Sequence, residues 1–399
     1  MESLIQMSEE LALVHRFSGR LANELSIICR PENPFAPVSQ QAESVFKKLD
    51  GILAAHAASN QHVVRETIFV RDIQQNLPAI LELRSQLGIA SDPTAVAPPV
   101  SFIQQAPLID GNSLEVSVQV LAPRDGNRWS VRDVWAEPAC TCAGCSNTQA
   151  RLVHLGDQSS LHATNVYGIG RDTYEQTLNM FHAAERLLQQ GGMNFGDVVR
   201  VWIYMRDIDR DYADLNKARR VFFQQLGIDL RPASTCVQGS PMPLEHDATL
   251  TIEAIRSSPR PRIQRMSTPK LNEAWTYGAD FSRGLRISEA NNVVLHISGT
   301  ASLDEAGQTV HVGELEAQAH RMIDNIESLL ANQGASLADI ASGVAYVKHA
   351  DHVSVLRTIF HQRGFDRFPC AVVHGPLCRP ELLCETEVVA WLPAETEQS

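Results

Sequence analysis

The chain has 399 residues, with 34 lysines and arginines against 46 aspartates and glutamates, a net charge of −12 and 44% hydrophobic residues. This composition excludes a disordered or fibrous chain, and no apolar run approaches the roughly 20 residues that span a bilayer. Because an acidic surface repels phosphate backbones and residues 1–10 lack a secretory signal pattern, we expect a cytoplasmic protein that acts on a small molecule, without nucleic-acid or membrane partners.

The first third of the chain predicts an amphipathic helix, a strand, a second helix and two further strands. Apolar residues at spacings of three and four put one face of the first helix at Ala42, Val45, Phe46, Leu49 and Leu53. The strand His62–Asp72 follows this helix, and the alternating strand Leu114–Val120 ends the unit. We assign this unit to residues 1–122.

The same order of features returns twice. The second copy has its helix face at Tyr174, Leu178, Phe181, Ala184 and Leu188, and the third has it at Leu315, Ala319, Met322, Ile326 and Leu330. The matching strands are Asp197–Asp207 and Asp339–His349, and the closing strands are Thr249–Ile255 and Leu382–Trp391. Hairpin-like strands open these copies at Leu161–Ile169, Phe281–Ile287 and Val293–Ser298.

Composition places the boundaries between the copies. Residues 123–152 are polar and contain three cysteines, and residues 258–270 are rich in proline and arginine, so both segments are predicted as linkers. The modules then cover residues 1–122, 153–257 and 271–393, with a tail at 394–399. Each module reads β-β-α-β-α-β-β, which predicts a mixed sheet with both helices on one face and an α/β (α+β) fold class.

Several motifs resemble the Rid/YjgF family: Glu175-Gln-Thr177, Arg231-Pro-Ala-Ser-Thr-Cys236 and Thr251-Ile-Glu-Ala254. The resemblance implies small YjgF-like (chorismate-mutase-like) subunits that form trimers around a barrel-like core, with ligand clefts between neighbours. Three fused modules therefore imply an intramolecular pseudo-trimer, either monomeric or assembled further. The C-terminal two-thirds looks more like the chorismatases, on Ile297–Ser302, His311–Glu314 and Cys378–Glu387.

The resemblance also implies which module carries chemistry. Imine hydrolases of the family hold a substrate carboxylate with an arginine two residues past a proline and position water with a glutamate on the last strand. At the arginine place this chain has Val100, Ser234 and Ala371, and at the glutamate place it has Glu115, Thr251 and Glu385. Module 1 is therefore expected to be degenerate and module 2 to be scaffold.

Module 3 alone places a cation and a carboxylate close together in sequence, which makes it the candidate catalytic module. By resemblance to the chorismatases, Glu385 is the general acid, Arg379 the carboxylate clamp and Cys378 a pocket-wall residue. The further substrate-binding candidates are Thr300, Ser302, His311 and Glu387. The opposing interpretation is that the paired glutamates form a solvated strand face and that Arg379 caps a turn.

A metal site is a separate hypothesis. Cys140, Cys142 and Cys145 could bind a structural zinc, with His154 or His162 as the fourth ligand, or they could be free thiols in an exposed loop. No phosphate-binding glycine loop is present, so neither ATP nor a nicotinamide is predicted and catalysis is expected to need no cofactor.

Three functions stay open at this point. The first is chorismatase-like hydrolysis of an enolpyruvyl ether to pyruvate and a cyclic hydroxy acid. The second is deamination of a 2-imino acid or enamine by the same groups. The third is a metabolite-binding scaffold without turnover, which the missing family arginine favours.

Overall fold

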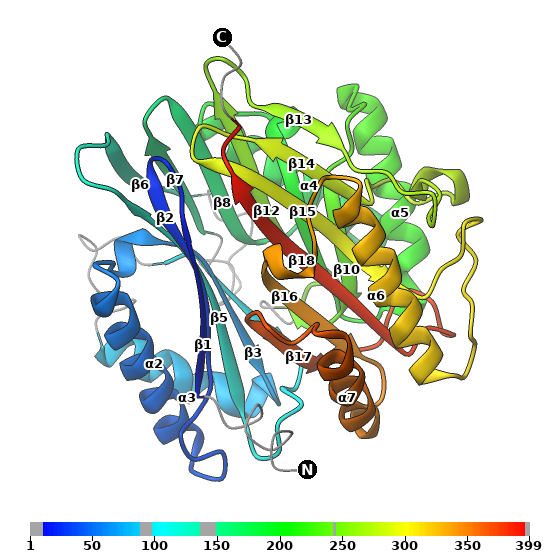
Figure 1. Ribbon diagram of the computed structural model, residues 1–399, viewed down its shortest axis with the longest axis horizontal. Helices are drawn as coiled ribbons and strands as arrows, with labels where there is room; N and C mark the ends of the chain where they lie inside the picture. Colours follow the sequence, from blue (N-terminus) through cyan, green and yellow to red (C-terminus); the bar gives the residue numbers. More distant parts are fainter. Residues whose placement is uncertain (1–10, 88–97, 136–148, 242–244, 396–399) are drawn as a thin grey trace.

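Three six-stranded sheets, each built mainly by one module, form the structure, a computed structural model (Figure 1). It describes residues 11–87, 98–135, 149–241 and 245–395. The first sheet has the order β1-β2-β5-β3-β4-β11, the second β10-β9-β12-β8-β7-β6 and the third β13-β14-β15-β18-β16-β17. The fold class is therefore mixed α+β with three fused modules, as the repeat predicts.

The described elements of module 1 are β1 (Ala12–Ser18), β2 (Ala22–Cys29), α2 (Val38–Ala55), β3 (Val63–Val70), α3 (Ile73–Gln86), β4 (Val100–Gln104) and β5 (Leu114–Pro123). Those of module 2 are β6 (Trp129–Trp135), β7 (Gln149–Leu155), β8 (Gln158–Val166), α4 (Thr173–Gln190), β9 (Val198–Met205), α5 (Ile208–Leu226), β10 (Ala233–Gln238), β11 (Ser240–Pro241) and β12 (Ala248–Ser257). Those of module 3 are β13 (Arg262–Arg265), η4 (Ala274–Tyr277), β14 (Gly284–Ser288), β15 (Asn292–Ala301), α6 (Leu315–Ala331), β16 (Ile340–Val347), α7 (Val353–Arg363), β17 (Cys370–His374) and β18 (Cys384–Pro393).

Both predicted linkers contribute strands. β6 lies within residues 123–152 and pairs with β7, and β13 lies within residues 258–270 and pairs with β14. Modules 2 and 3 therefore open with three strands where the sequence predicts two. β13 is polar apart from Ile263, and Asp133 interrupts the apolar alternation of β6, which explains why the pattern does not predict these short edge strands.

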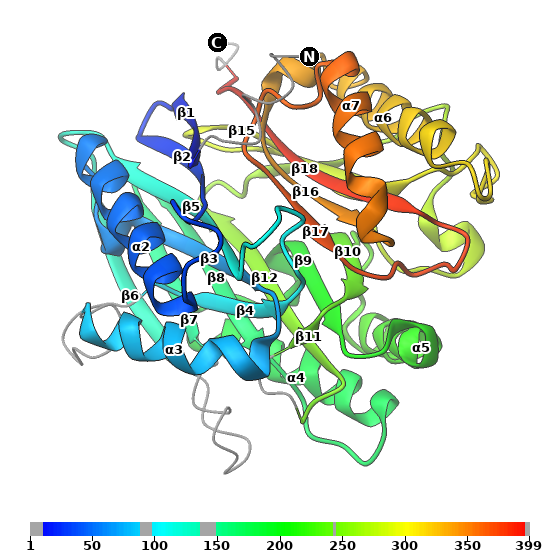
Figure 2. The same ribbon diagram turned by 90° about the horizontal axis from the view of Figure 1, so that it is seen from below.

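Each sheet contains one parallel pair, because a helix connects its two strands as a crossover. These pairs are β3 with β4, β9 with β10, and β16 with β17. The helix pairs α2/α3, α4/α5 and α6/α7 lie around the outside of the molecule, and the sheets face inward (Figures 1 and 2). No described helix has the length and apolarity that crossing a membrane requires.

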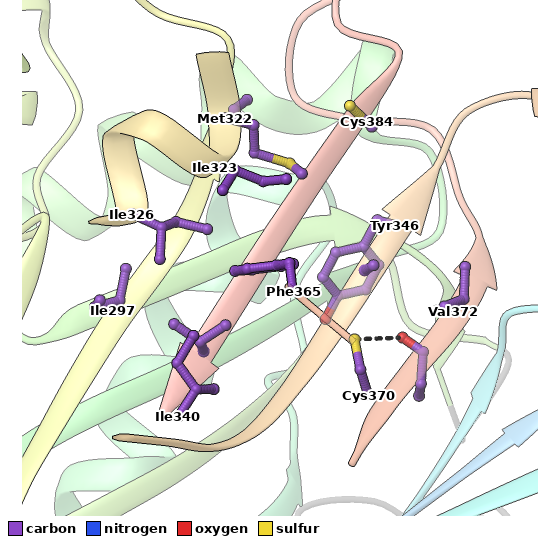
Figure 3. Packing of buried hydrophobic residues seen from close by; sticks show 14 of the residues in the cluster. Ile297, Met322, Ile323, Ile326, Ile340, Tyr346, Phe365, Cys370, Val372 and Cys384 are labelled. Atoms are coloured by element: carbon purple, nitrogen blue, oxygen red, sulfur yellow. Dashed lines mark hydrogen bonds between the residues drawn. The ribbon is translucent and has the colours of Figure 1, made fainter. Parts of the chain in front are cut away.

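The helices bury the faces that the spacing predicts, with one shift. In α6, Met322, Ile323 and Ile326 point toward the strands of the third sheet (Figure 3). In α4, Phe181, Ala184 and Leu188 are buried, but Tyr174 and Leu178 are only half-buried. Met180 and Leu187 take part in the buried face instead, so the apolar stripe of α4 is rotated from the predicted one.

Three backbone junctions close the modules into a ring. β11 leaves module 2 and pairs with β4 of module 1. The amide of His374 in module 3 donates to Ala106 O at 2.9 Å, and the amide of Gln238 in module 2 donates to Pro376 O at 3.1 Å. Each module thus continues onto the edge of a neighbour, which gives the intramolecular pseudo-trimer.

Candidate active site

A cavity of about 290 Å³ lies where module 2 meets module 3. α5 and β10 provide one wall, while η4, β15, β18 and the turn before β18 provide the other. The polar lining residues are Tyr212, Asn216, Arg219, Ser234 and Cys236 from module 2, and Tyr277, Arg283, Gln308, Cys378, Arg379 and Glu385 from module 3. The predicted residues Glu385, Arg379 and Cys378 are therefore brought together.

Glu385 is the acidic residue of this cavity. It is 5% exposed, and no hydrogen bond or ion pair joins its carboxyl group to another residue in the described ranges. Burial, followed by repulsion from Glu387, raises the pKa of Glu385 from its ordinary value of 4.5 to about 8. The group therefore keeps its proton at neutral pH and can donate it.

The position of the Glu385 carboxyl group requires glycine at position 299. A β-carbon on Gly299 would lie 2.0 Å from Glu385 Oε1, well inside van der Waals contact. A bulge in the pairing of β15 with β18, between Ile297 and Thr300, falls at this point. Gly299 is therefore needed because the Glu385 carboxyl group packs directly against its backbone, and not because the chain turns at this point.

Arg219 brings a guanidinium group from helix α5. Its side chain is fully buried, with Nη2 donating to Asn216 Oδ1 at 2.6 Å and Nη1 donating to Ser234 Oγ at 3.4 Å. Its Nε is buried without a described partner. Ser234 lies where the resemblance predicts the family arginine, so Arg219 brings a guanidinium group next to that predicted place from helix α5.

Arg379 and Arg283 line the opposite side. Arg379 Nη1 donates to Gly307 O at 2.8 Å, and Arg283 Nε donates to Asn272 O at 2.9 Å. Both guanidinium groups lie over the ring of Tyr277, at 4.9 Å and 5.2 Å from its centroid. Arg379 therefore also fastens the loop that contains Gly307.

The three arginines share one electrostatic property. Within the described part of the chain, none of Arg219, Arg283 and Arg379 forms an ion pair with an acidic side chain. Glu385 does not neutralise them while it holds its proton. The cavity is therefore cationic at neutral pH, and an anionic ligand would supply the missing charge.

The remaining predicted residues do not line this cavity. Thr300 Oγ1 donates to Ser298 O, and Ser302 Oγ donates to Val310 O, so both hydroxyls hold the β15 loop together. His311 is exposed, with a left-handed φ of 59°. Glu387 lies in the centre of the ring, where it bonds to side chains of module 2.

The strand registers correct two of the matched positions. Phe69, Tyr204 and Tyr346 hold the same place in the three modules, and their partners are Glu115, Thr249 and Glu385. Thr249 therefore holds the glutamate place in module 2, and not Thr251. The predicted arginine position is also shifted in module 3. By strand pairing, the residue equivalent to Val100 and Ser234 is Cys370, and not Ala371, because Cys370 lies one residue closer to its preceding proline than Ser234 does. Neither change restores a missing glutamate or arginine.

Glu115 of module 1 shows how a sibling acid is neutralised. Arg30 follows β2 next to Glu115, and its Nε lies 3.1 Å from Glu115 Oε2. The corresponding neighbour of Glu385 is Ala301, which carries no charge and lines the cavity. The two acids therefore differ through one neighbour: Arg30 neutralises Glu115, whereas Ala301 leaves Glu385 facing the cavity.

The predicted metal ligands Cys140, Cys142 and Cys145 lie outside the described residues. His154 Nδ1 lies 2.7 Å from Ser159 Oγ, and His162 is buried, with desolvation lowering its pKa to about 3.

Arg219, Arg283, Tyr212 and Tyr277 are missing from the sequence prediction. For Arg219 a signal existed, because it lies four residues after Leu215 and three before Phe222, within the buried stripe of α5. Arginine is almost never fully buried unless it is paired, so an arginine within an apolar stripe indicates a polar partner or a polar site next to the helix. Arg283 and Tyr277 lie in an irregular segment with no such periodicity.

Comparisons with known proteins agree with this architecture. The sequence model of the family described as Endoribonuclease L-PSP matches residues 147–256 and 275–391. A solved chorismatase crystal structure superimposes with a TM-score of 0.59 and 17% identity, over 83% of this chain and 94% of that chain. This likeness in fold extends beyond the C-terminal two-thirds and so reaches into module 1.

Three relatives match in sequence. A chorismatase from Streptomyces rapamycinicus is 26% identical over 226 residues, which is 50% of this chain and only 65% of that protein. A 3-hydroxybenzoate synthase from Streptomyces hygroscopicus is 25% identical over 71% of this chain and 87% of its own length. A 3-aminoacrylate deaminase, RutC, from Acinetobacter baylyi is 30% identical over 26% of this chain and 82% of its own length.

The pKa of Glu385 predicts a stability difference that depends on pH. Because the folded state holds this proton up to about pH 8 and the unfolded chain loses it near pH 4.5, wild-type stability falls over that interval. Glu385→Gln removes the penalty, so its melting temperature relative to wild type should rise with pH from about 5 to about 8 and then level off. Thermal melts at several pH values measure this, with Glu381→Gln on the exposed turn as control. A difference that does not change with pH would contradict the assignment.

Proposed function

The chain belongs to the Endoribonuclease L-PSP (Rid/YjgF) family, and from this premise we propose that its module 2–module 3 cavity hydrolyses an enolpyruvyl ether in the manner of a chorismatase. The products are pyruvate and a cyclic hydroxy acid. One observation carries the proposal: the unpaired carboxyl group of Glu385, whose pKa burial raises to about 8, shares a cavity with three guanidinium groups that lack acidic partners among the described residues. A dicarboxylate with an acid-sensitive vinyl ether matches both features.

The chemical step needs one proton donor and one water. Glu385 gives its proton to the terminal methylene carbon of the enolpyruvyl group, and the electron pair of that double bond forms the new C–H bond. The resulting oxocarbenium ion takes up water at the same carbon that carries the ether oxygen. The added water gives one proton to the Glu385 carboxylate, which restores the acid and leaves a hemiketal. The hemiketal collapses to pyruvate as its hydroxyl proton passes to the ring oxygen, which leaves as the alcohol. A positioned acid contributes roughly 10²–10⁴-fold to such a step.

The arginines bind and orient in this proposal. Asn216 and Asn272 hold Arg219 and Arg283 in place. The remaining N–H groups of both arginines can therefore donate to planar carboxylates with little further loss of side-chain conformational entropy. Arg379 has the same role while it also holds the loop around Gly307. Cys378 is a wall residue, and burial raises the pKa of its thiol to about 12, so it takes part as a neutral group.

A second candidate is the deamination of an enamine or 2-imino acid. The match to a 3-aminoacrylate deaminase favours it, and Arg219 next to Ser234 supplies a guanidinium where the family arginine is missing. The deamination candidate uses the same acid and the same carboxylate-binding groups, so only products separate the two reactions.

Cleavage of RNA, which the family name suggests, is not proposed. A net charge of −12 opposes binding of a phosphate backbone, and a cavity of about 290 Å³ holds one small ring and its substituents.

The first test measures products. Purified protein incubated with chorismate should release pyruvate, and Glu385→Gln should lower the rate by at least about 10²-fold because the proton donor is lost. A parallel incubation with enzymatically generated 2-iminobutyrate or aminoacrylate follows ammonia release. Ammonia release without pyruvate release supports deamination, and no turnover of either substrate supports the scaffold interpretation.

The second test addresses carboxylate binding. Arg219→Gln should raise KM by roughly 10- to 100-fold, because a charge-assisted hydrogen bond contributes about 1.5–3 kcal/mol. The matched control is Arg220→Gln, since Arg220 is the next residue on α5 but is exposed and pairs with Asp280. Equal KM values for the two variants would remove Arg219 from the binding site.

The third test is the pH dependence of kcat. A general acid must be protonated, so kcat should hold below the pKa of Glu385 and fall through a midpoint near pH 8 as that proton is lost. Steady-state rates at saturating substrate between pH 5.5 and 9.5 give the profile. A rate that increases through pH 8 would instead indicate a base in this position.

A further inference from the structure

Glu387 follows Glu385 on the same face of β18 but does not reach the cavity. It is buried in the centre of the ring, where a space of about 30 Å³ is lined by all three sheets. Glu387 Oε2 accepts a hydrogen bond from Arg200 Nη2 at 2.7 Å, and Oε1 accepts one from Trp202 Nε1 at 2.7 Å. Both carboxylate oxygens are thus fixed by module 2.

Arg200 connects this carboxylate to the wall behind Glu385. Its Nη2 also donates to Thr235 Oγ1 at 2.6 Å. The same hydroxyl oxygen accepts a hydrogen bond from the amide of Gly299 at 3.0 Å, and Gly299 is the residue against which Glu385 Oε1 packs. A chain of four contacts therefore runs from Glu387 to the surroundings of Glu385.

The two acids are close but differ in their partners. Two residues along a strand separate their Cα atoms by about 6.5–7 Å, and both side chains leave the same face. Glu387 has Arg200 as its counter-ion, whereas Glu385 has none. Burial is the largest cause that raises the pKa of Glu385, and the like charge of Glu387 at this range adds to it.

Other groups also act on Glu385. The charged ones are Arg200 on β9, Arg283 before β14 and Arg379 in the turn before β18, and the neutral titratable ones are Cys236, Cys378, Cys384 and Tyr346. All three arginines favour ionisation of Glu385, and Glu387 is the one charge among these groups that opposes it.

We propose that the buried Glu387–Arg200 pair is a positioning device for Glu385: the carboxylate of Glu387, two residues along the same face of β18, opposes a second negative charge at Glu385, and Arg200 with Thr235 fixes the backbone on which the acid rests. This inference rests on the proposed role of Glu385 as proton donor. It assigns Glu387 a part in the reaction without contact to substrate.

The test replaces one buried acid and compares it with another. Glu387→Gln should move the alkaline limb of the kcat profile to lower pH by about 1–2 pH units, because the repulsion is lost and Arg200 is left unpaired. The control is Glu253→Gln, since Glu253 is equally buried in the ring interior but does not act on Glu385. The control profile should coincide with that of wild type.

A measurement without turnover separates this inference from the proposed reaction. The infrared C=O band of a protonated carboxylic acid, taken as the difference between wild type and Glu385→Gln at pH 7, reports the Glu385 proton directly. Introducing Glu387→Gln into both members of that pair should weaken or abolish this difference band, while Glu253→Gln introduced in the same way should leave it intact. An unchanged band with Glu387→Gln overturns the inference even if pyruvate is released, and a lost band supports it even if chorismate is not the substrate.

Two further variants guard against misfolding. Glu387→Asp keeps the charge and should restore the wild-type limb. Arg200→Gln with Glu387→Gln removes both charges and should give a midpoint between those of wild type and Glu387→Gln. A limb that shifts equally in all three variants would indicate a structural effect and contradict the electrostatic role.

Discussion

A carboxyl group buried without a counter-ion is the constraint on which this structure depends. Taking an ionised carboxylate out of water costs several kcal/mol, so a folded protein either pairs it or keeps it neutral. The chain uses both solutions at corresponding places. Glu115 is paired by Arg30, whereas Glu385 is left facing a cavity with Ala301 as its neighbour. In the proposed reaction the unpaired acid is the proton donor, and the nearby guanidinium groups bind the anionic substrate.

Fusion of the three modules allows this difference between clefts. In a ring of identical subunits every cleft carries the same side chains, so an arginine that neutralises the acid of one cleft neutralises the acid of every cleft. Here the last-strand position has become Glu115, Thr249 and Glu385, and the helix α5 of module 2 contributes Arg219 to the cleft that it shares with module 3. The second module lacks an acid of its own but supplies one wall of the site, so it is more than a spacer.

The sequence predicts most of the fold and part of the site, for reasons that differ by element. Long amphipathic helices and buried strands repeat their spacing, so the modules, their order and the ring could be predicted. β6 and β13 were missed because edge strands of four to seven residues are too short to show a clear period, and Asp133 interrupts the apolar alternation of β6. Glu385, Arg379 and Cys378 are near one another in the chain and could be found together. Arg219 and Arg283 reach the same cavity from residues far away in sequence, and only the packing of α5 and η4 against β18 brings them there. The sequence predicts Glu387 as a substrate-binding residue because strand alternation gives the face on which a side chain lies but not the neighbour that covers it.

Ring closure also affects how the molecule comes apart. The pairing of β11 with β4 and the bonds from His374 to Ala106 and from Gln238 to Pro376 tie every module to both of its neighbours. Detaching one module would break two of these junctions and expose the polar interior around Arg200 to water. Partial unfolding of a single unit is therefore costly, and amide protons at the junctions should exchange only when the whole molecule opens. The cleft between modules 2 and 3 thereby gains a rigidity that a boundary between two independently folding domains would lack.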